Sequence, residues 1–197
     1  MNVLLFGRKP PLQQWEGRSY SGQAFRGAQI GGNRDEYARE VATEAPGDPE
    51  EGGPYRRLAD AIFRFDVFSP KRIEGVTPRS PLEEGDVVGV AYRVLPGLRL
   101  FFASRITHTF DEATDGLRRT GFTYRTLDGH PEEGEETFAV EKHLETGRLT
   151  VRLSSWSRPG LGPTRLPLAP RLMRKLQVRE CEAALDHLAS IADPVSA

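Results

Sequence analysis

Hydrophobic and polar residues alternate with a period of two through most of the stretch from Asp86 to Trp156. This alternation is typical of strands that bury one face. It predicts five strands, over Val87–Leu95, Leu98–Phe110, Arg118–Thr126, Glu135–Leu144 and Arg148–Trp156. The segments that separate them are short and turn-like, so consecutive strands are expected to pair antiparallel as a meander.

Two other stretches follow a helical period. Pro54 suits the first turn of a helix, where its missing N–H would be unpaired anyway. The residues that then recur at helical spacing are Tyr55, Leu58, Ile62 and Phe65. A longer helix is predicted over Pro167–Ala192.

The apolar residues of this long helix fall on two sides. Leu172 and Leu176 lie on one side, and nearly opposite lie Val178, Cys181, Leu185 and Leu188. This division indicates either a kink near Gln177 or a helix that is covered on two sides.

The region before Pro54 reads as an N-terminal extension, residues 1–53, to a core of residues 54–192 within one domain. Short strands are expected in the apolar run Val3–Phe6 and around Gln23–Ile30. Asn33 precedes Glu36 by three residues, which is the spacing of a capping box, and predicts a short helix to about Ala45.

Two further segments are expected to lack regular structure. Pro46–Gly53 combines Pro, Gly and acidic residues without an apolar side chain, so it is predicted to be an exposed loop. Prolines and charges make Val67–Leu82 irregular.

These elements define an α+β fold in which a curved antiparallel β-meander packs against a long C-terminal helix. A helix gripped by a strongly curved sheet leaves a cavity between them. Cavities of that kind are the default ligand sites of proteins.

Size, charge and cysteine content narrow the class of protein. The chain has 197 residues, enough for one domain with a sizeable core, and a formal net charge of −1, which favours no nucleic-acid partner. Cys181 is the only cysteine, so no internal disulfide can form and a cytoplasmic location is expected. The apolar run at the N-terminus is far shorter than the roughly 7–15 residues of a secretory signal or the ~20 of a membrane span.

One long segment carries a family resemblance. Residues 121–136 read GFTYRTLDGHPEEGEE and resemble the signature Y-G-T-L-x-G-H-P-x-x-G-E-E of an uncharacterised domain-of-unknown-function family of bacteria and plants. The likeness runs from about Tyr55 to Leu188, and includes Ser104-Arg105-Ile106, Ser157-Arg158-Pro159 and Gln177. Where the family has a glycine after the tyrosine, this chain has Arg125.

The resemblance implies a fold. That family is similar to the START-like or polyketide-cyclase (SRPBCC) superfamily, whose members have a helix-grip fold around an apolar cavity. It implies no particular function, because none is established for the family. Arg125 places a long cation on the strand face opposite Tyr124, where it changes the outer surface rather than the pocket.

The signature strand supplies candidate ligand contacts. Tyr124 and Thr126 share a strand face with Phe122, so two hydroxyls lie beside aromatic surface and could orient a mostly apolar ligand. The alternative is that they hydrogen-bond within the core.

Arg105 shares a face with Phe101 and Ala103, so an inward guanidinium would need an anionic partner. Either it anchors a ligand carboxylate or phosphate, or it forms a buried pair with Glu135 or Glu136. A hairpin over Tyr124–Glu136 is expected to bring these groups together.

Metal and cofactor chemistry is not expected. His130 lies in a turn among glutamates without any recognisable ligand spacing, and a His that caps a solvated turn explains it better. His108, His143 and His187 have no triad-like company, and G-x-S-x-G, P-loop and C-x-x-C motifs are missing from the sequence. Cys181 fits a small core residue.

Charge is distributed unevenly near the C-terminus. No acidic residue occurs between Thr146 and Arg179. The cations of this basic segment are Arg148, Arg152, Arg158, Arg165, Arg171, Arg174, Lys175 and Arg179. They could meet anionic lipid headgroups or an acidic partner. Alternatively, the acid-rich stretch Glu132–Glu141 together with Glu180 and Glu182 neutralises them.

The leading functional hypothesis is a non-catalytic binder of a small hydrophobic or amphipathic molecule such as a lipid, an isoprenoid or a polyketide-like compound. The candidate walls are Phe101, Phe122, Phe138, Val151 and Leu153, and the candidate polar contacts are Arg105, Tyr124, Thr126 and Glu136. The alternatives are an enzyme with Tyr124 or Glu136 as general acid or base, and an interaction module that uses the basic segment.

Overall fold

The period-two pattern does form strands. The computed structural model describes residues 4–6, 11–22, 32–160 and 169–193. The strands of this part are β1 (Leu4–Phe6), β2 (Asn33–Thr43), β3 (Ile73–Val76), β4 (Val87–Leu95), β5 (Leu98–Thr114), β6 (Leu117–Thr126), β7 (Glu132–His143) and β8 (Arg148–Pro159). The helices are the short 3-10 helix η1 (Leu12–Trp15), α1 (Pro54–Phe63) and α2 (Ala169–Ala192).

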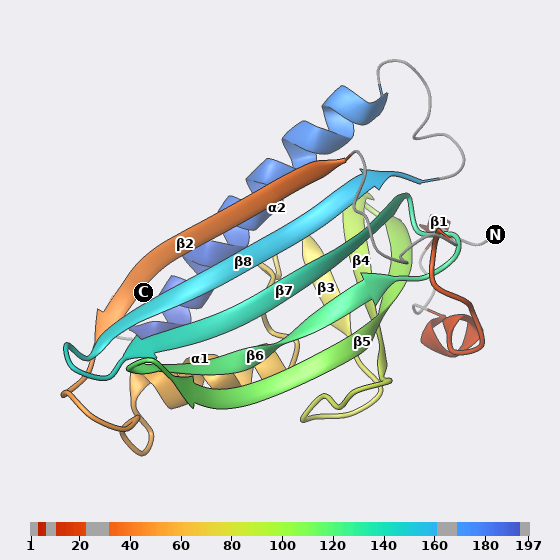
Figure 1. The fold of residues 1–197 in the computed structure, drawn as a ribbon. Coiled ribbons are helices and arrows are strands. Elements are labelled where there is room, and N and C mark those ends of the chain that lie inside the picture. The colour runs from red at the N-terminus through yellow and green to blue at the C-terminus, as the bar shows by residue number, and fades with distance from the viewer. Residues whose placement is uncertain (1–3, 7–10, 23–31, 161–168, 194–197) are drawn as a thin grey trace.

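One curved sheet organises these elements (Figure 1). Its order is β2-β8-β7-β6-β5-β4-β3, and β1 pairs with β5 beside this path. Every pair is antiparallel. The predicted meander from β4 to β8 is therefore confirmed, and α2 lies along one face of the sheet behind β2 and β8 (Figure 1). This is the α+β fold that the sequence predicts, in which a curved antiparallel sheet packs against a long C-terminal helix.

The helix predicted from Asn33 to about Ala45 is wrong, because this segment is strand β2, paired with β8 along its whole length. The capping-box spacing indicates only a local preference for a helix. The backbone pairing of this segment with β8 stabilises the strand more than that preference stabilises a helix. The inward-facing positions of β2 include the charged residues Asp35 and Arg39. The alternation of hydrophobic and polar residues that indicates a strand is therefore missing from this part of the sequence.

Three smaller expectations have mixed outcomes. Strand β3 interrupts the segment predicted as irregular, and four residues are too few to show a period. Strand β1 matches the expected N-terminal strand, whereas the strand expected over Gln23–Ile30 lies outside the described residues. Pro46–Gly53 is exposed over most of its length, as predicted, although Gly53 is buried.

The concave face of the sheet carries the main core. α1 and α2 cover it, and α2 contributes Cys181, Ala184, Leu185 and Leu188, all of which are buried. Cys181 is thus a core residue, as predicted. The side chain of Leu172 lies outside the described residues, and Leu176 is half-buried.

The convex face carries a second, smaller core. Trp15 of η1 packs against Phe101 with ring centroids 6.1 Å apart, and Ala103 and Leu127 complete this cluster. The N-terminal segment therefore covers the outside of β4 and β5, opposite α2.

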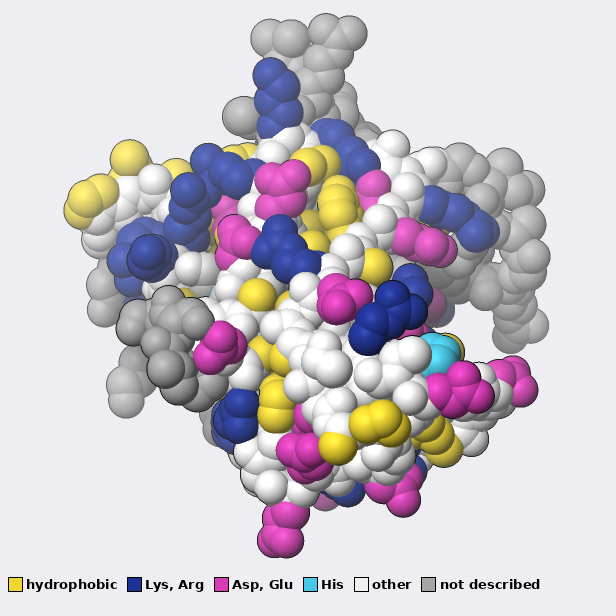
Figure 2. All heavy atoms as spheres, turned by 90° about the vertical axis from the view of Figure 1, so that its left-hand side faces the viewer, with side chains coloured by type: hydrophobic (Ala, Val, Ile, Leu, Met, Phe, Trp, Pro, Cys, Tyr) yellow, Lys and Arg dark blue, Asp and Glu magenta, His cyan; other side chains and the backbone are white. Residues whose placement is uncertain are grey.

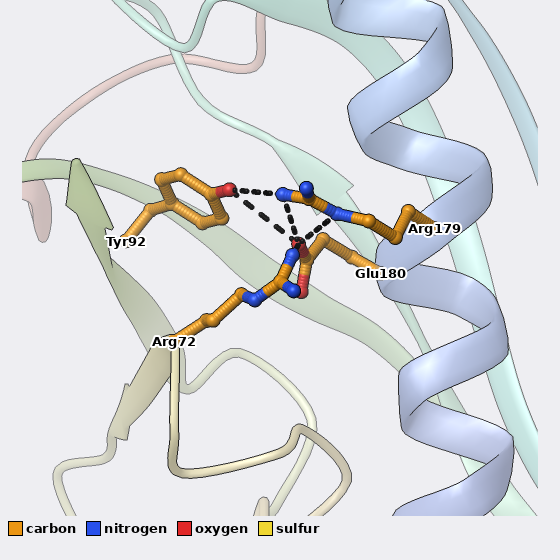
Figure 3. Close-up of polar contacts among 4 residues, drawn as sticks. All are labelled: Arg72, Tyr92, Arg179 and Glu180. Carbon is orange, nitrogen blue, oxygen red and sulfur yellow. Dashed lines mark hydrogen bonds and ion pairs between the residues drawn. The ribbon is translucent and has the colours of Figure 1, made fainter.

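Ion pairs hold α2 at both edges of the sheet. On the β2 edge, Arg174 pairs with Asp35 and Arg39 pairs with Asp186. At the β3–β4 edge, the Glu180 carboxylate accepts a hydrogen bond from Arg72 at 3.1 Å, and the Arg179 guanidinium donates to the Tyr92 hydroxyl at 2.9 Å (Figure 3). The helix is thus attached across the opening of the curved sheet.

A buried ion pair fixes the other end of the fold. The Lys142 ammonium, 0% exposed, donates to Glu44 at 2.7 Å, and the other oxygen of that carboxylate accepts the backbone N–H of Tyr55 at 2.8 Å. Burial alone would raise the pKa of Glu44, but the hydrogen bonds from Lys142 and from backbone N–H groups hold it below its usual value. The pair connects β7, the end of β2 and the first turn of α1.

Leu185→Ala should destabilise the protein by roughly 2–5 kcal/mol, because it empties a buried position between α2 and the sheet. Urea unfolding measures the change. Glu182→Ala, on the exposed face of the same helix, should stay within about 0.5 kcal/mol of wild type. Equal effects of the two substitutions would mean that this face of α2 is not buried.

Lys142→Met should cost about 3–5 kcal/mol of unfolding free energy, because it leaves the Glu44 carboxylate buried without its cation. Adding Glu44→Gln should recover a large part of the loss, as seen by chemical denaturation. Arg148→Met, which removes an exposed pair with Glu40, is the control and should change stability by less than about 1 kcal/mol. Strict additivity of the Lys142 and Glu44 substitutions would contradict the pairing.

Candidate functional site

A row of polar side chains crosses the concave face of the sheet. The strand registers place Tyr124 of β6 beside Glu136 of β7, then Ser155 of β8, then Asp35 of β2. Because side chains alternate between the two faces of a sheet, partners in register point to the same side. These four groups therefore form one continuous band.

An apolar row runs directly beside the polar one. Phe122 pairs with Phe138, Phe138 with Leu153, and Leu153 with Tyr37. Phe122 and Phe138 are 0% exposed, whereas Tyr37, Glu136 and Ser155 are half-buried. Accessible surface on the concave face therefore lies along the polar band, at the boundary with apolar side chains.

The centre of the polar band is a hydrogen-bonded pair. The Tyr124 hydroxyl donates to Glu136 Oε2 at 2.5 Å. Burial raises the pKa of Glu136 to about 7, against the opposing effect of the Tyr124 hydrogen bond, and nearby Glu132 and Asp35 raise it further. Burial and the Glu136 carboxylate raise the pKa of Tyr124 well above its usual value. The carboxyl group can therefore give or take a proton near neutral pH.

Glu132 extends the band toward the β6–β7 hairpin. Its side chain has the same strand parity as Glu136, and burial raises its pKa to about 7. His130, in the turn, contacts the Phe102 ring with centroids 4.5 Å apart, and its Nδ1 lies 2.8 Å from the Glu132 carbonyl oxygen. Burial lowers the pKa of His130 to about 4, so the imidazole is neutral at pH 7.

α2 contributes the groups opposite the sheet. Both terminal nitrogens of Arg174 bind the two carboxylate oxygens of Asp35, and one of them also donates to Gln177 Oε1 at 3.1 Å. The Gln177 amide donates to Ser157 Oγ at 3.1 Å. Burial and the neighbouring carboxylate of Glu136 raise the pKa of the Cys181 thiol, so it is protonated.

The predicted hairpin over Tyr124–Glu136 is present. The turn closes with a hydrogen bond from the His130 N–H to the Leu127 carbonyl at 2.9 Å. Gly134 is needed where β7 passes β8, because a Cβ there would lie 2.4 Å from the Trp156 carbonyl oxygen. Of the predicted site residues, Phe122, Tyr124, Glu136 and Phe138 do meet on the concave face.

Phe122 and Phe138 belong to a packed aromatic cluster. The Phe65 ring lies 5.9 Å from that of Phe122, and the Phe68 ring 5.5 Å from that of Phe138. Val151 and Leu153 are buried in the same core. These four predicted wall residues therefore form the base beneath the accessible part of the concave face.

Thr126 is buried, and its hydroxyl has protein partners. It accepts the Gly134 N–H at 2.9 Å and contacts the Ser21 hydroxyl. Its hydrogen bonds hold the base of the hairpin and the N-terminal segment together, which is the core role that the sequence left open.

The expectation that Arg105 faces the same interior as Tyr124 is wrong. In the register of β5 and β6, Arg105 lies opposite Arg125, the residue next to Tyr124, so both arginines point to the convex side. There Arg105 donates to the Glu16 carbonyl at 2.5 Å and lies over the Tyr20 ring, 5.5 Å from its centroid.

Two related predictions change with Arg105. Phe101 has the same strand parity and lies in the convex cluster with Trp15, so it is not a wall of the concave face. Glu135 pairs in register with Arg125 on the outside. The predicted approach of Arg105 to Glu136 therefore does not occur, because the sheet lies between them.

Five arginines of the basic segment pair with carboxylates of the chain. Arg152 pairs with Glu141, Arg158 with Glu133, and Arg179 with Glu180. Arg148 and Arg174 also pair with carboxylates of β2, and Arg165 and the side chain of Arg171 lie outside the described residues. Basic and acidic side chains intermingle on the described part of the surface in Figure 2, without a large patch of one sign.

The other histidines lie elsewhere. His108 contacts Glu84 and His187 contacts Asp66. Within residues 4–6, 11–22, 32–160 and 169–193, no three His, Cys, Asp or Glu side chains are grouped so that they could hold a metal ion.

Sequence reasoning missed Asp35, Glu132, Ser155 and Arg174 as parts of this site. Strand alternation could have identified Glu132, because it lies an even number of residues before Glu136 and therefore points to the same face of β7. Asp35 was hidden because its strand was taken for a helix. Arg174 joins the site only through the packing of α2 against β2.

The fold and the site define an α+β helix-grip protein whose concave face carries adjoining apolar and acidic bands. The chain belongs to the family described as "Domain of unknown function (DUF1990)", whose profile matches residues 27–183. It is also similar to a "UPF0548 protein" of Dictyostelium discoideum, with 25% identity over 145 residues, which cover 69% of this chain and 67% of the relative.

The structure also aligns with solved structures. A hypothetical protein of Helicobacter pylori, jhp0584, aligns with a TM-score of 0.51 and 10% identity over 81% of this chain and 86% of its own. Protein CV1439 of Chromobacterium violaceum aligns with a TM-score of 0.47 and 13% identity over 82% and 98% of the two chains. Among the described helices, none is both long and apolar enough to cross a membrane.

Glu136→Gln should change how stability depends on pH. The pKa of Glu136 is about 7 in the folded protein, above the unfolded value of about 4.3, so the folded state binds more protons between these values and the wild type loses stability as pH rises through them. The variant should lose less, so its stability relative to wild type should improve by about 1–3 kcal/mol between pH 5 and pH 8. Urea unfolding at the two pH values tests this.

The control is Glu135→Gln, on the opposite face, which should leave the wild-type pH dependence of stability in place. A Glu136→Gln protein with the wild-type pH dependence would contradict the pKa assigned to Glu136.

Proposed function

We propose that this protein binds a small amphipathic molecule on the concave face, with the polar part of the ligand on the Tyr124–Glu136–Ser155 band and its apolar part on the adjoining aromatic side chains. The observation that carries the proposal is the half-buried band itself. Polar side chains inside a core have hydrogen-bond partners in the protein. Here Glu136 and Ser155 keep accessible surface beside a closed apolar base.

The chemistry of the band suits a ligand site. Ligand sites place a few polar groups at the edge of mostly apolar surface, where the polar groups fix the orientation of the ligand. Phe102 of β5 and Tyr37 of β2 are half-buried aromatic side chains that pack against the main core. The Tyr124–Glu136 pair supplies a polar contact of fixed geometry.

A second function is favoured by one observation, the pKa of Glu136. A carboxyl group that titrates near pH 7 beside a tyrosine hydroxyl can act as a general acid or base on a bound molecule. An enzyme with Glu136 as the proton-transfer group is therefore the alternative. Once a substrate is known, loss of turnover with retained binding in Glu136→Gln would distinguish this function from binding alone.

A matched pair of tryptophan substitutions tests binding. Ser155→Trp should fill the accessible band, and Ser154→Trp places the same side chain at the adjacent exposed position. With the neutral probe N-phenyl-1-naphthylamine, wild type and Ser154→Trp should show saturable fluorescence enhancement, and Ser155→Trp should bind at least about tenfold more weakly, a loss of ~1.4 kcal/mol.

Folding of each variant is checked by circular dichroism, and Ser155→Leu is the milder replacement if Ser155→Trp does not fold. Unchanged probe affinity in a folded Ser155 variant would show that the probe binds elsewhere. A wild type that takes up no probe, and from which gentle purification and mass spectrometry recover no small molecule, would end the binding proposal.

A further inference from the structure

The groups around Glu136 carry an excess of negative charge. β6 presents Tyr124 to it, β7 presents Glu132, and β2 presents Asp35 and Tyr37. From α2 come Arg174 and the protonated Cys181, and the hairpin adds neutral His130. Among these described groups, Arg174 is the cation and the three carboxyl groups are its possible partners.

Arg174 is already committed to one of the three. Its two terminal nitrogens bind the two oxygens of Asp35 in a bidentate pair, and its remaining contact in the site is with Gln177. Fork-to-fork pairing of this kind is the strongest arrangement between a guanidinium and a carboxylate. In the part of the chain that the structure describes, Glu132 and Glu136 therefore form no ion pair on the concave face.

An uncompensated carboxylate in a half-buried site is unfavourable, and two remedies exist. Either the group keeps its proton, or a cation binds. The raised pKa values of both glutamates agree with the first remedy in the free protein. A ligand that supplies positive charge would provide the second, whereas an anionic ligand would add further repulsion.

Hydrogen bonding leads to the same chemistry. A carboxylate offers about four acceptor positions and no donor. The Tyr124 hydroxyl occupies one of these acceptor positions on Glu136. A ligand with hydrogen-bond donors would fill the remaining positions. An ammonium group combines charge with up to three donors, and half-buried Tyr37 and Phe102 supply aromatic surface for an attached hydrocarbon chain.

We propose that the ligand of this site is an amphipathic amine, whose protonated nitrogen binds Glu136, with Glu132 adding negative charge farther along β7, while its apolar part lies against the aromatic side chains. This inference rests on the proposed binding function and specifies the chemical class of the ligand. It excludes the fatty-acid or phosphate ligand that an inward Arg105 would have favoured.

Three decyl compounds of matched chain length test the inference: decylamine, decanol and decanoate. Each competes with N-phenyl-1-naphthylamine at pH 7.5, below the concentration at which it forms micelles. Decylamine should bind most tightly and decanoate most weakly, with at least about a tenfold difference between them, which corresponds to ~1.4 kcal/mol. In Glu132→Gln/Glu136→Gln, decylamine should fall to the affinity of decanol, and Glu135→Gln on the convex face should keep the wild-type order.

Calorimetry gives a readout that is independent of the order of affinities. At pH 6 decylamine is fully protonated, so any proton released on binding comes from the protein. Binding should release protons as Glu136 ionises beside the ammonium, and the measured enthalpy should therefore depend on the ionisation enthalpy of the buffer. This dependence should disappear in the double variant, and its absence in the wild type would overturn the inference.

The outcomes separate this inference from the proposed function. If decanol and the probe bind but decylamine has no advantage over decanoate, the binding site stands and the amine assignment is overturned. A preference for decylamine that survives in the folded double variant also overturns it, because the charge would then be recognised elsewhere. If neither the probe nor any decyl compound binds, the proposed function itself fails.

Discussion

The attachment of α2 across the open side of a curved sheet is the interaction on which the rest of this structure depends. Leu185 and Leu188 bury the helix in the core, but apolar packing alone does not fix its position along the sheet. The ion pairs of Asp35 with Arg174 and of Arg39 with Asp186 hold one side of the helix. The cluster of Glu180 with Arg72, Arg179 and Tyr92 holds the other side (Figure 3).

The same covering helix produces both the core and the candidate site. It contributes Cys181, Leu185 and Leu188 to the main core, which stabilises the fold. It also brings Cys181 near Glu136 and Arg174 near Glu132, the two carboxyl groups whose pKa values burial raises. Stability and proton chemistry are therefore coupled in one layer of the protein. A substitution that loosens α2 is expected to return both carboxyl groups toward their ordinary acidity.

Strand parity separates two sets of glutamates on β7. Glu133 and Glu141 point to the convex face, where Arg158 and Arg152 neutralise them. Glu132 and Glu136 point to the concave face, where Arg174 is held by Asp35. Residues of one type, in one strand, thus have opposite roles because alternate side chains meet different surroundings. The fold alone assigns no activity, and the functional proposals rest on these particular side chains.

Local elements with a clear period or motif could be predicted from the residues alone. The alternation from Asp86 to Trp156 gave the meander, the helical spacing from Tyr55 gave α1, and the hairpin motif placed Tyr124 and Glu136 together, because each of these signals is written within a few neighbouring residues. That Asn33–Thr43 is a strand depends on tertiary contacts, since its inward charges are paired with a helix that lies more than a hundred residues away in the sequence. The outward direction of Arg105 depends on them too, because the face of a strand depends on its register with neighbouring strands, and a register is a property of the assembled sheet.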